Sequence, residues 1–154
     1  MTHPTIVPLI GTWQGVGHGD YPTIERFDYR ERIEFVAPPT KPFLAYRQQT
    51  QRIGGDEQPL HAESGFLRVT DDGQLEWMIA QPTGITEIHR GTATDDAFHF
   101  TTEHVASSAT AKIVRRVDRR IDLLAPDRLR YELWMEAVGQ AHQIHLIAVL
   151  DLVT

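Results

Sequence analysis

Eight histidines and a complete absence of cysteine limit the chemistry open to this chain of 154 residues. Without a thiol, the chain forms no disulfide, no thiolate metal site, no thiolate nucleophile and no thioether link to a cofactor. Ser64, Ser107 and Ser108 all lie outside any Gly-x-Ser-x-Gly turn, so a hydrolytic triad is not predicted. A bound metal would therefore be held by histidine or carboxylate.

His145 is the histidine that best suits a buried metal ligand. It lies in the most continuous apolar stretch of the chain, IHLIAVL at 144–150. An imidazolium would be penalised there, whereas a bond to a metal would account for a buried neutral imidazole. From the residues alone, a core histidine satisfied by a backbone carbonyl stays the favoured interpretation. His142 is the rival ligand, but at three residues' distance in a strand it points to the opposite face.

The elements that would position these side chains are predicted to be β-strands. In RLRYELWMEAV at 128–138, Leu129, Tyr131, Leu133 and Met135 fall on one side and most charged residues on the other, at a period of two. Turn signals recur about one strand apart, in segments such as APPTKP, GGDEQP and QPTG. No long segment has a period of 3.6. We predict an all-β fold of about ten strands joined by short turns.

A sheet of this size avoids exposed edges by closing into a barrel. Eight strands already suffice to enclose one small ligand, so about ten should enclose a substantial cavity. The prediction is a single domain, residues 1–154, folded as an antiparallel up-and-down barrel. Its type would be that of lipocalins and fatty-acid-binding proteins, with an internal ligand cavity.

Charge and hydropathy restrict the classes of partner that the chain could bind. The formal net charge is −6 and the only lysines are Lys41 and Lys112, whereas nucleic-acid binding relies on clustered basic side chains. The opening MTHPTIVPLIG is too short in apolar residues for a signal peptide, and no stretch approaches the ~18 apolar residues of a membrane span. We expect a cytoplasmic protein without nucleic-acid or membrane partners, as a monomer or a homodimer.

The glycine-rich stretch GTWQGVGHGDYPT at 11–23 does not fit a phosphate-binding loop. Its glycines alternate instead of following Gly-x-Gly-x-x-Gly, and no Gly-Lys-Ser/Thr ending is present. In a barrel, Trp13 would plug one end. The alternating glycines would let the strand bend sharply or let a flat ligand approach the backbone.

Successive blocks of the chain resemble the nitrobindin family of small haem-binding β-barrels. The stretch 11–23 is similar to the family's Gly-x-Trp-x-Gly-x-Gly signature. The later blocks follow in order at similar spacing: KPFLAYRQQT, PLHAESGFLRV, PTGITEIHRGT, TAKIV, MEAVGQ and HLIAVL. The resemblance covers nearly the whole chain and implies one non-covalent haem b with ferric iron. It also implies an enzyme that isomerises peroxynitrite to nitrate and can bind nitric oxide.

The resemblance implies roles for individual residues as well. His145 matches the proximal histidine of the family's C-terminal strand, the axial iron ligand. Leu60 and His61 match the block that lines the distal side, where a donor on His61 would stabilise a bound anion during catalysis. Further haem contacts are expected from Met135 in the cavity lining, from Gly15 and Gly17 in the first strand, and from Thr23 and Lys112 beside the propionates at the barrel mouth.

Simpler interpretations stay open beside these. Met135 suits ordinary core packing, His61 a wetted rim and Lys112 a solvated strand. The remaining histidines are predicted to be surface or strand positions: His3, His89, His99 and His104. A run of arginines is predicted to be a solvated stretch flanking the sheet, with a propionate or partner contact as the less favoured alternative: Arg115, Arg116, Arg119 and Arg120. The alternative functions are a non-haem, lipocalin-like carrier of a small apolar ligand, and a haem or nitric oxide sensor or store without turnover.

Overall fold

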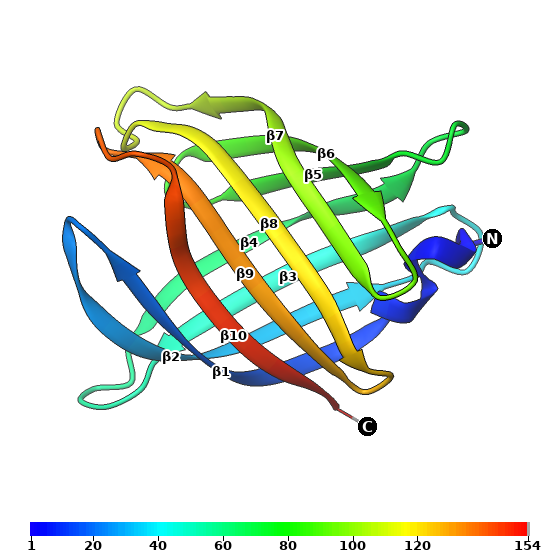
Figure 1. Cartoon of the computed structure of the whole chain (residues 1–154), viewed down its shortest axis with the longest axis horizontal. Coiled ribbons are helices and arrows are strands. Elements are labelled where there is room, and N and C mark those ends of the chain that lie inside the picture. Colours follow the sequence, from blue (N-terminus) through cyan, green and yellow to red (C-terminus); the bar gives the residue numbers. More distant parts are fainter. Residues whose placement is uncertain (154) are drawn as a thin grey trace.

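The computed structural model describes residues 1–153 as ten strands preceded by a short 3₁₀ helix, η1 (Pro4–Leu9). The strands are β1 (Gly11–Tyr21), β2 (Ile24–Val36), β3 (Phe43–Arg52), β4 (Pro59–Val69), β5 (Leu75–Gln81), β6 (Ile85–Ala93), β7 (Ala97–Ser107), β8 (Val114–Ala125), β9 (Arg128–Ala137) and β10 (Gln143–Val153). Each pairs antiparallel with its neighbour along the chain, and β1 pairs with β10 to close the barrel (Figure 1). The predicted all-β, up-and-down barrel is confirmed. Among residues 1–153, no helix is long and apolar enough to cross a bilayer.

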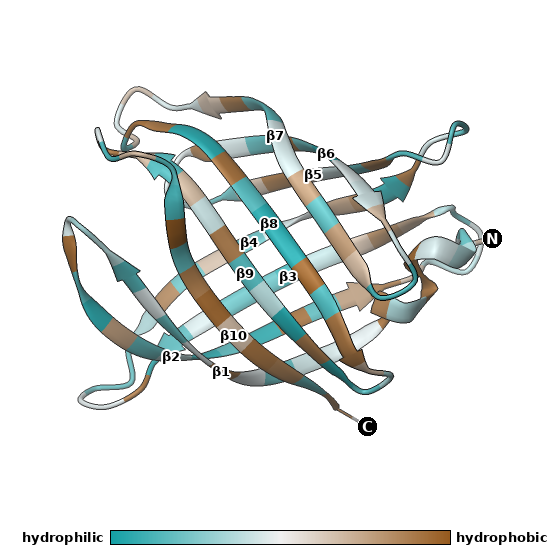
Figure 2. Cartoon of the chain, in the orientation of Figure 1, coloured by the Kyte–Doolittle hydropathy of each residue, from teal (hydrophilic) through white to brown (hydrophobic). Residues whose placement is uncertain are grey.

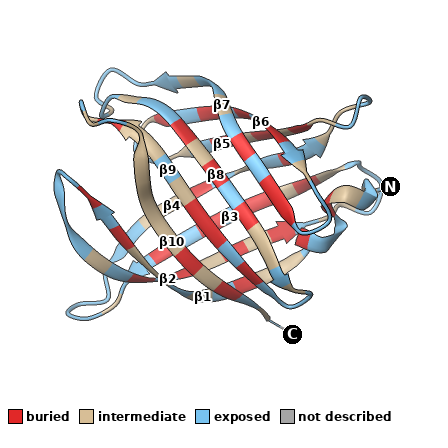
Figure 3. Ribbon diagram, viewed as in Figure 1, coloured by how far each residue is buried: buried red, intermediate tan, exposed pale blue. Residues whose placement is uncertain are grey.

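Strand formation follows the two-residue alternation of the sequence. Along β9, Leu129 and Tyr131 are buried while Arg128 and Arg130 are exposed. Hydrophobic and hydrophilic positions alternate along the strands (Figure 2), and the buried positions follow the same rhythm (Figure 3). Each strand therefore sends one set of side chains into the barrel and the other set to solvent.

One end of the barrel is closed by η1 and the first residues of β1. Ile6 and Leu9 of this helix and Trp13 of β1 are completely buried. The Trp13 indole Nε1 donates a hydrogen bond of 2.9 Å to the Leu9 carbonyl, which fixes the helix to the strand. The expected plug at Trp13 is thus made by a helix and a tryptophan together. These residues join a continuous apolar core that fills this end of the barrel.

The alternating glycines of β1 allow close packing of the barrel wall. A Cβ atom on Gly15 would lie 2.0 Å from the Val149 carbonyl oxygen of β10. A Cβ on Gly17 would lie 2.7 Å from Cζ of Tyr29, and one on Gly19 would lie 2.3 Å from Cζ of Phe27. The glycines therefore leave room for the neighbouring backbone and for two aromatic rings of β2, which turn toward the barrel interior.

Candidate functional site

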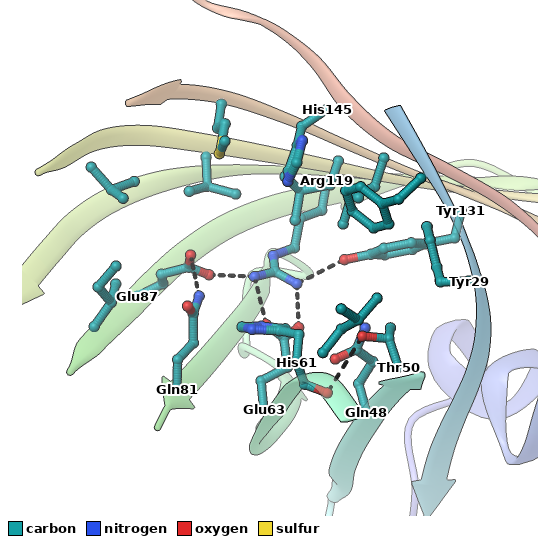
Figure 4. Close-up of a pocket in the computed structure, with 18 residues that line it drawn as sticks. Tyr29, Gln48, Thr50, His61, Glu63, Gln81, Glu87, Arg119, Tyr131 and His145 are labelled. Atoms are coloured by element: carbon teal, nitrogen blue, oxygen red, sulfur yellow. Dashed lines mark hydrogen bonds and ion pairs between the residues drawn. The ribbon is translucent and has the colours of Figure 1, made fainter. Parts of the chain in front are cut away.

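The other half of the barrel interior is a cavity of about 280 Å³ (Figure 4). Its lining is drawn from β2 to β6 and from β8 to β10: Phe27, Tyr29, Gln48, Thr50, Leu60, His61, Glu63, Gln81, Ile85, Glu87, Val114, Val117, Arg119, Tyr131, Leu133, Met135, His145 and Leu146. Apolar side chains make up one part of this lining. A cluster of buried ionisable and hydroxyl side chains makes up the other.

His145 enters the cavity at an irregularity of strand β10. The register between β10 and β9 shifts between Ile144 and Leu146, which leaves His145 as the unpaired residue. Such a bulge redirects side chains, and both His145 and the adjacent Leu146 line the cavity. The rings of Tyr21 and Phe27 pack edge-on against the imidazole, with centroids 5.4 and 6.4 Å away.

The tautomer of His145 follows from its hydrogen bond. The ring Nδ1 lies 3.0 Å from the Asp20 carbonyl oxygen, which can only accept, so Nδ1 carries the proton and donates it. The Nε2 atom then keeps its lone pair. Burial lowers the pKa of His145, against the opposing hydrogen bond to Asp20, so the neutral imidazole is favoured. A neutral imidazole with a free Nε2 is the form that binds iron.

A buried arginine organises the polar part of the cavity. The Arg119 guanidinium donates 2.6 Å to Glu87 Oε2 and 2.7 Å to the Tyr131 hydroxyl, and it binds both oxygens of Glu63. Its side chain is 1% exposed. Burial opposes the charge on Arg119, but the two carboxylates outweigh it and hold its pKa well above the usual value.

The prediction that Arg119 is solvated is therefore wrong. Arg119 lies between Val117 and Ile121 on the inward face of β8, while its neighbour Arg120 points outward and pairs with Asp122. The two-residue period alone assigns Arg119 to the inner face. Its acidic partners lie in β4 and β6, far from β8 along the chain, so the sequence around Arg119 does not reveal them.

Each carboxylate that binds Arg119 also binds a histidine. His61 Nε2 lies 3.1 Å from Glu63 Oε2, and His89 Nε2 lies 3.0 Å from Glu87 Oε2. Burial opposes ionisation of both glutamates, but Arg119 and the histidine hydrogen bonds hold the pKa of each carboxyl below its usual range. His89 is completely buried within β6, so of the two predicted alternatives the structure shows a strand position and not a surface one.

A second buried acid lies beside this cluster. Glu31 is 2% exposed and accepts a hydrogen bond of 3.2 Å from the Gln48 side chain. Burial, together with the nearby Glu63 charge, raises the pKa of Glu31 to about 7, despite the lowering effects of the Gln48 hydrogen bond and the Arg119 charge. Glu31 occupies an inward position of β2 between Tyr29 and Ile33. It is the single charge that breaks the apolar face of this strand in the sequence.

The cavity brings together four of the residues predicted for a haem site: His145, His61, Leu60 and Met135. Gly15 and Gly17 lie in the wall and are absent from the lining. Thr23, in the β1–β2 turn, and Lys112, in the β7–β8 connection, are exposed and also absent from it. His142 lies outside the cavity, where it stacks on Trp134 and binds Asp118 at 2.9 Å. Of this histidine pair, only His145 enters the barrel.

Sequence reasoning missed the polar residues of the cavity. Glu63, Glu87 and Arg119 each alternate with apolar residues on an inward face, and that alternation is the signal that could have found them. Within residues 1–153, no group of three or more histidine or acidic side chains is arranged to hold a bare metal ion. The one histidine with a free ring nitrogen at the apolar part of the cavity is suited to a metal that arrives inside a cofactor.

Comparison with known proteins agrees with this geometry. A family model described as a THAP4-like, heme-binding beta-barrel domain matches residues 4–151. The peroxynitrite isomerase of Nocardia farcinica is 44% identical over 155 residues, covering 96% of this chain and 90% of the relative. Peroxynitrite isomerase 2 of Mycobacterium avium is 46% identical over 157 residues, covering 96% and 94%.

A solved structure shares the whole fold. The crystal structure of Rv2717c from M. tuberculosis superposes with a TM-score of 0.89 at 41% sequence identity, and the match covers 100% of both chains. The two chains therefore share one architecture over their full length. The chain therefore belongs to the family of THAP4-like, heme-binding β-barrel domains, the nitrobindins.

Proposed function

We propose that this protein binds one ferric haem b through His145 and isomerises peroxynitrite to nitrate. The observation that carries the proposal is the free Nε2 of a neutral, part-buried imidazole at the apolar part of an internal cavity. Two relatives at 44% and 46% identity bear the name peroxynitrite isomerase. Both lines of support point to the same cavity.

The residues present fit a haem. A porphyrin is a flat, apolar ring with anionic propionates, so it needs an apolar slot, an axial base and an opening to solvent. Phe27, Ile85, Leu133 and Met135 supply apolar walls. His145 supplies the base. Thr23 and Lys112 lie in connections at the open end of the barrel, where a hydroxyl and an ammonium would meet propionates.

A ferric haem held there would supply an electrophilic iron with one position open to a small anion. The chain's own residues do the rest. His145 orients the cofactor through Nε2, because its Nδ1–H is fixed by the Asp20 carbonyl. Leu60 and Met135 keep the ligand side apolar and limit water, and His61 presents a polar ring to the space beside them. Arg119 stays paired with two carboxylates and is not free to bind the ligand.

Binding of nitric oxide belongs to the same proposal, because a neutral diatomic ligand needs only the open iron position and a dry cavity. A carrier of apolar ligands would use the same walls. Such a carrier would not require an imidazole whose tautomer leaves Nε2 facing the cavity. The choice between these functions therefore turns on His145.

The first experiment is a hemin titration of the purified apo-protein, followed in the Soret region. We expect saturable one-to-one binding for the wild type and for His142→Ala, whose ring lies outside the cavity. We expect the His145→Ala variant to lose the band or shift it. Peroxynitrite decay and nitrate yield are then measured on the loaded wild type. Absence of saturable binding in every variant would reject the haem function, and binding without accelerated decay would leave a store or sensor.

A further inference from the structure

The imidazole of His61 is held by a buried carboxylate. Its Nε2 lies 3.1 Å from Glu63 Oε2, and Glu63 is bound on its other side by Arg119. A carboxylate paired with a guanidinium is ionised and only accepts hydrogen bonds, so Nε2 of His61 must carry the proton. Within residues 1–153, His61 Nδ1 has no hydrogen-bond partner. The ring lines the cavity, and Nδ1 is the atom left for a ligand.

A second arm of the same cluster repeats this arrangement. Arg119 also binds Glu87, and Glu87 binds His89 Nε2 at 3.0 Å. With both imidazoles neutral, one guanidinium and two carboxylates leave the cluster with a net charge of −1. One added proton would neutralise it. The His89 side chain is 0% exposed and burial lowers its pKa, whereas the His61 side chain is 29% exposed at the cavity.

We propose that Glu63 is a positioning residue that presents His61 Nδ1 to the cavity as a proton acceptor, so that the site takes up a small weak acid and separates it into anion and imidazolium. The inference deepens the proposed function and, for its ligand, rests on it. With peroxynitrite as the ligand, the weak acid is its protonated form, peroxynitrous acid. Its O–H bond breaks, the proton moves to Nδ1, the bonding pair stays on the oxygen, and no electron is transferred. His61 then becomes the donor that holds the anion.

The charged and titratable groups around His61 come from several strands. Glu63 lies on its own strand, Arg119 faces it from β8 and Glu87 from β6, and together these three carry −1. Glu31 on β2 stays largely protonated below pH 7, since burial raises its pKa to about 7. His145 on β10 is neutral, with its own proton committed to the Asp20 carbonyl. Apart from Arg119, these neighbours bring no fixed positive charge against an imidazolium at His61.

The cluster offers a matched pair of variants for the test. Glu63→Gln and Glu87→Gln each remove one negative charge from a buried glutamate that binds both Arg119 and a histidine. They differ in which histidine they release. A purely structural or electrostatic role predicts similar effects from the two, whereas positioning of His61 predicts a clearly larger effect from Glu63→Gln than from Glu87→Gln.

The first readout is the tautomer of His61 in the apo-protein, measured by ¹⁵N NMR of the ring nitrogens. We expect the Nε2–H tautomer in the wild type and in Glu87→Gln, and a mixture of tautomers in Glu63→Gln. This arm needs no haem, so it stands or falls separately from the proposed function. An Nδ1–H tautomer in the wild type would overturn the inference even if neither variant folds. Equal effects of the two variants would overturn it as well.

The second readout is ligand association with the hemin-loaded protein. Hydrogen cyanide loses a proton when it binds ferric haem as the anion, whereas nitric oxide has no proton to lose. We expect cyanide association at neutral pH to slow about tenfold in Glu63→Gln and about a hundredfold in His61→Ala. Glu87→Gln removes the same charge but leaves His61 held by Glu63, so its slowing should be clearly smaller than that of Glu63→Gln. Nitric oxide association should be unchanged throughout. Equal slowing of both ligands would indicate altered access to the cavity and would overturn proton uptake by His61.

Discussion

At the scale of single residues, two cavity histidines are held in opposite tautomers by acceptors of different kinds. The Asp20 carbonyl takes the Nδ1 proton of His145, and the Glu63 carboxylate takes the Nε2 proton of His61. One ring therefore offers Nε2 to the cavity and the other offers Nδ1. A change of a single hydrogen-bond partner is enough to give two identical side chains different chemistry.

Removal of the buried cation is predicted to destabilise the barrel. Arg119→Met leaves Glu63 and Glu87 buried without their counter-ion, which should lower the free energy of unfolding at pH 7 by about 3–5 kcal/mol. Urea denaturation measures this change. Arg120→Met is the control, because that side chain is exposed and its ion pair with Asp122 contributes at most about 1 kcal/mol.

The same variant has a predicted pH dependence. In the wild type the pKa of both glutamates is lowered in the folded state, so their stabilising contribution is complete above the unfolded pKa of about 4 and is lost only below it. In Arg119→Met the unpaired carboxyls take up protons at higher pH, which relieves the penalty. The stability gap should narrow as the pH falls from 7 through 4. A gap of constant size would contradict the assignment of Arg119 as the counter-ion.

Glu31 is predicted to contribute a pH dependence of the free energy of unfolding with the opposite sign. Its pKa is about 7 in the folded state against 4.5 for an unperturbed glutamate, so the folded state loses stability as the pH rises between these values. Glu31→Gln does not titrate. Its free energy of unfolding relative to wild type should increase from pH 4.5 to pH 7.5 by on the order of 3 kcal/mol. Denaturation of both proteins at both pH values tests this, and a difference that stays constant between them would contradict it.

At the scale of elements, strand β1 lets neighbouring atoms approach its backbone closely, and strand β10 contains a bulge that interrupts the alternation of its side chains. The glycines of β1 admit the β10 backbone and the aromatic rings of β2. The bulge of β10 turns His145 and Leu146 into the same cavity, which a regular strand would not do. Glycine spacing was visible in the sequence and suggested a special first strand. The bulge was not visible, because it depends on the register with β9.

Gly15→Ala tests the close approach. The added Cβ would lie 2.0 Å from the Val149 carbonyl oxygen and 2.9 Å from Cα of Leu150, and these backbone atoms of β10 cannot move aside as a flexible side chain could. We expect a loss of about 1–3 kcal/mol in the free energy of unfolding, measured in urea. The adjacent Gln14 points outward and is exposed, so Gln14→Ala should change stability by at most about 0.5 kcal/mol. Equal stability of the two variants would refute the packing argument.

At the scale of the whole molecule, the barrel divides its interior between a core and a cavity. Helix η1 and Trp13 close the core end, and the core continues to residues such as Phe35 and Trp77. The cavity occupies the other end, below the β1–β2 turn and the β7–β8 connection. The helix-capped apolar end and the ligand cavity therefore occupy different halves of one closed sheet.

The Leu9→Ala variant tests whether the core end and the cavity end of the barrel are independent of each other. Leu9 is completely buried, so its truncation should lower the free energy of unfolding by about 2–5 kcal/mol. Because Leu9 does not line the cavity, hemin should still bind the folded variant with unchanged stoichiometry. Denaturation and a Soret titration of the same preparation measure both quantities. Loss of stoichiometric binding in a folded sample would show that the two ends are coupled.

The sequence by itself determined the barrel and suggested a candidate ligand within it. The two-residue alternation and the regular turn signals specify about ten antiparallel strands, and edge closure follows from their number. A lone histidine in an apolar strand identified His145 as the candidate ligand, and the family resemblance supplied its role. These are local properties, because each can be recognised within one strand or one turn.

Only the tertiary structure decided the chemistry around that ligand. Arg119 binds partners that are 56 and 32 residues away in the chain, and His61 and His89 obtain their orientation from those partners. Alternation assigned Arg119 to an inward position, but a buried charge is stable only where opposite charges meet it. Those charges are brought together by closure of the sheet, which no single strand encodes. The ring nitrogen that His61 offers to the cavity is fixed at the same step.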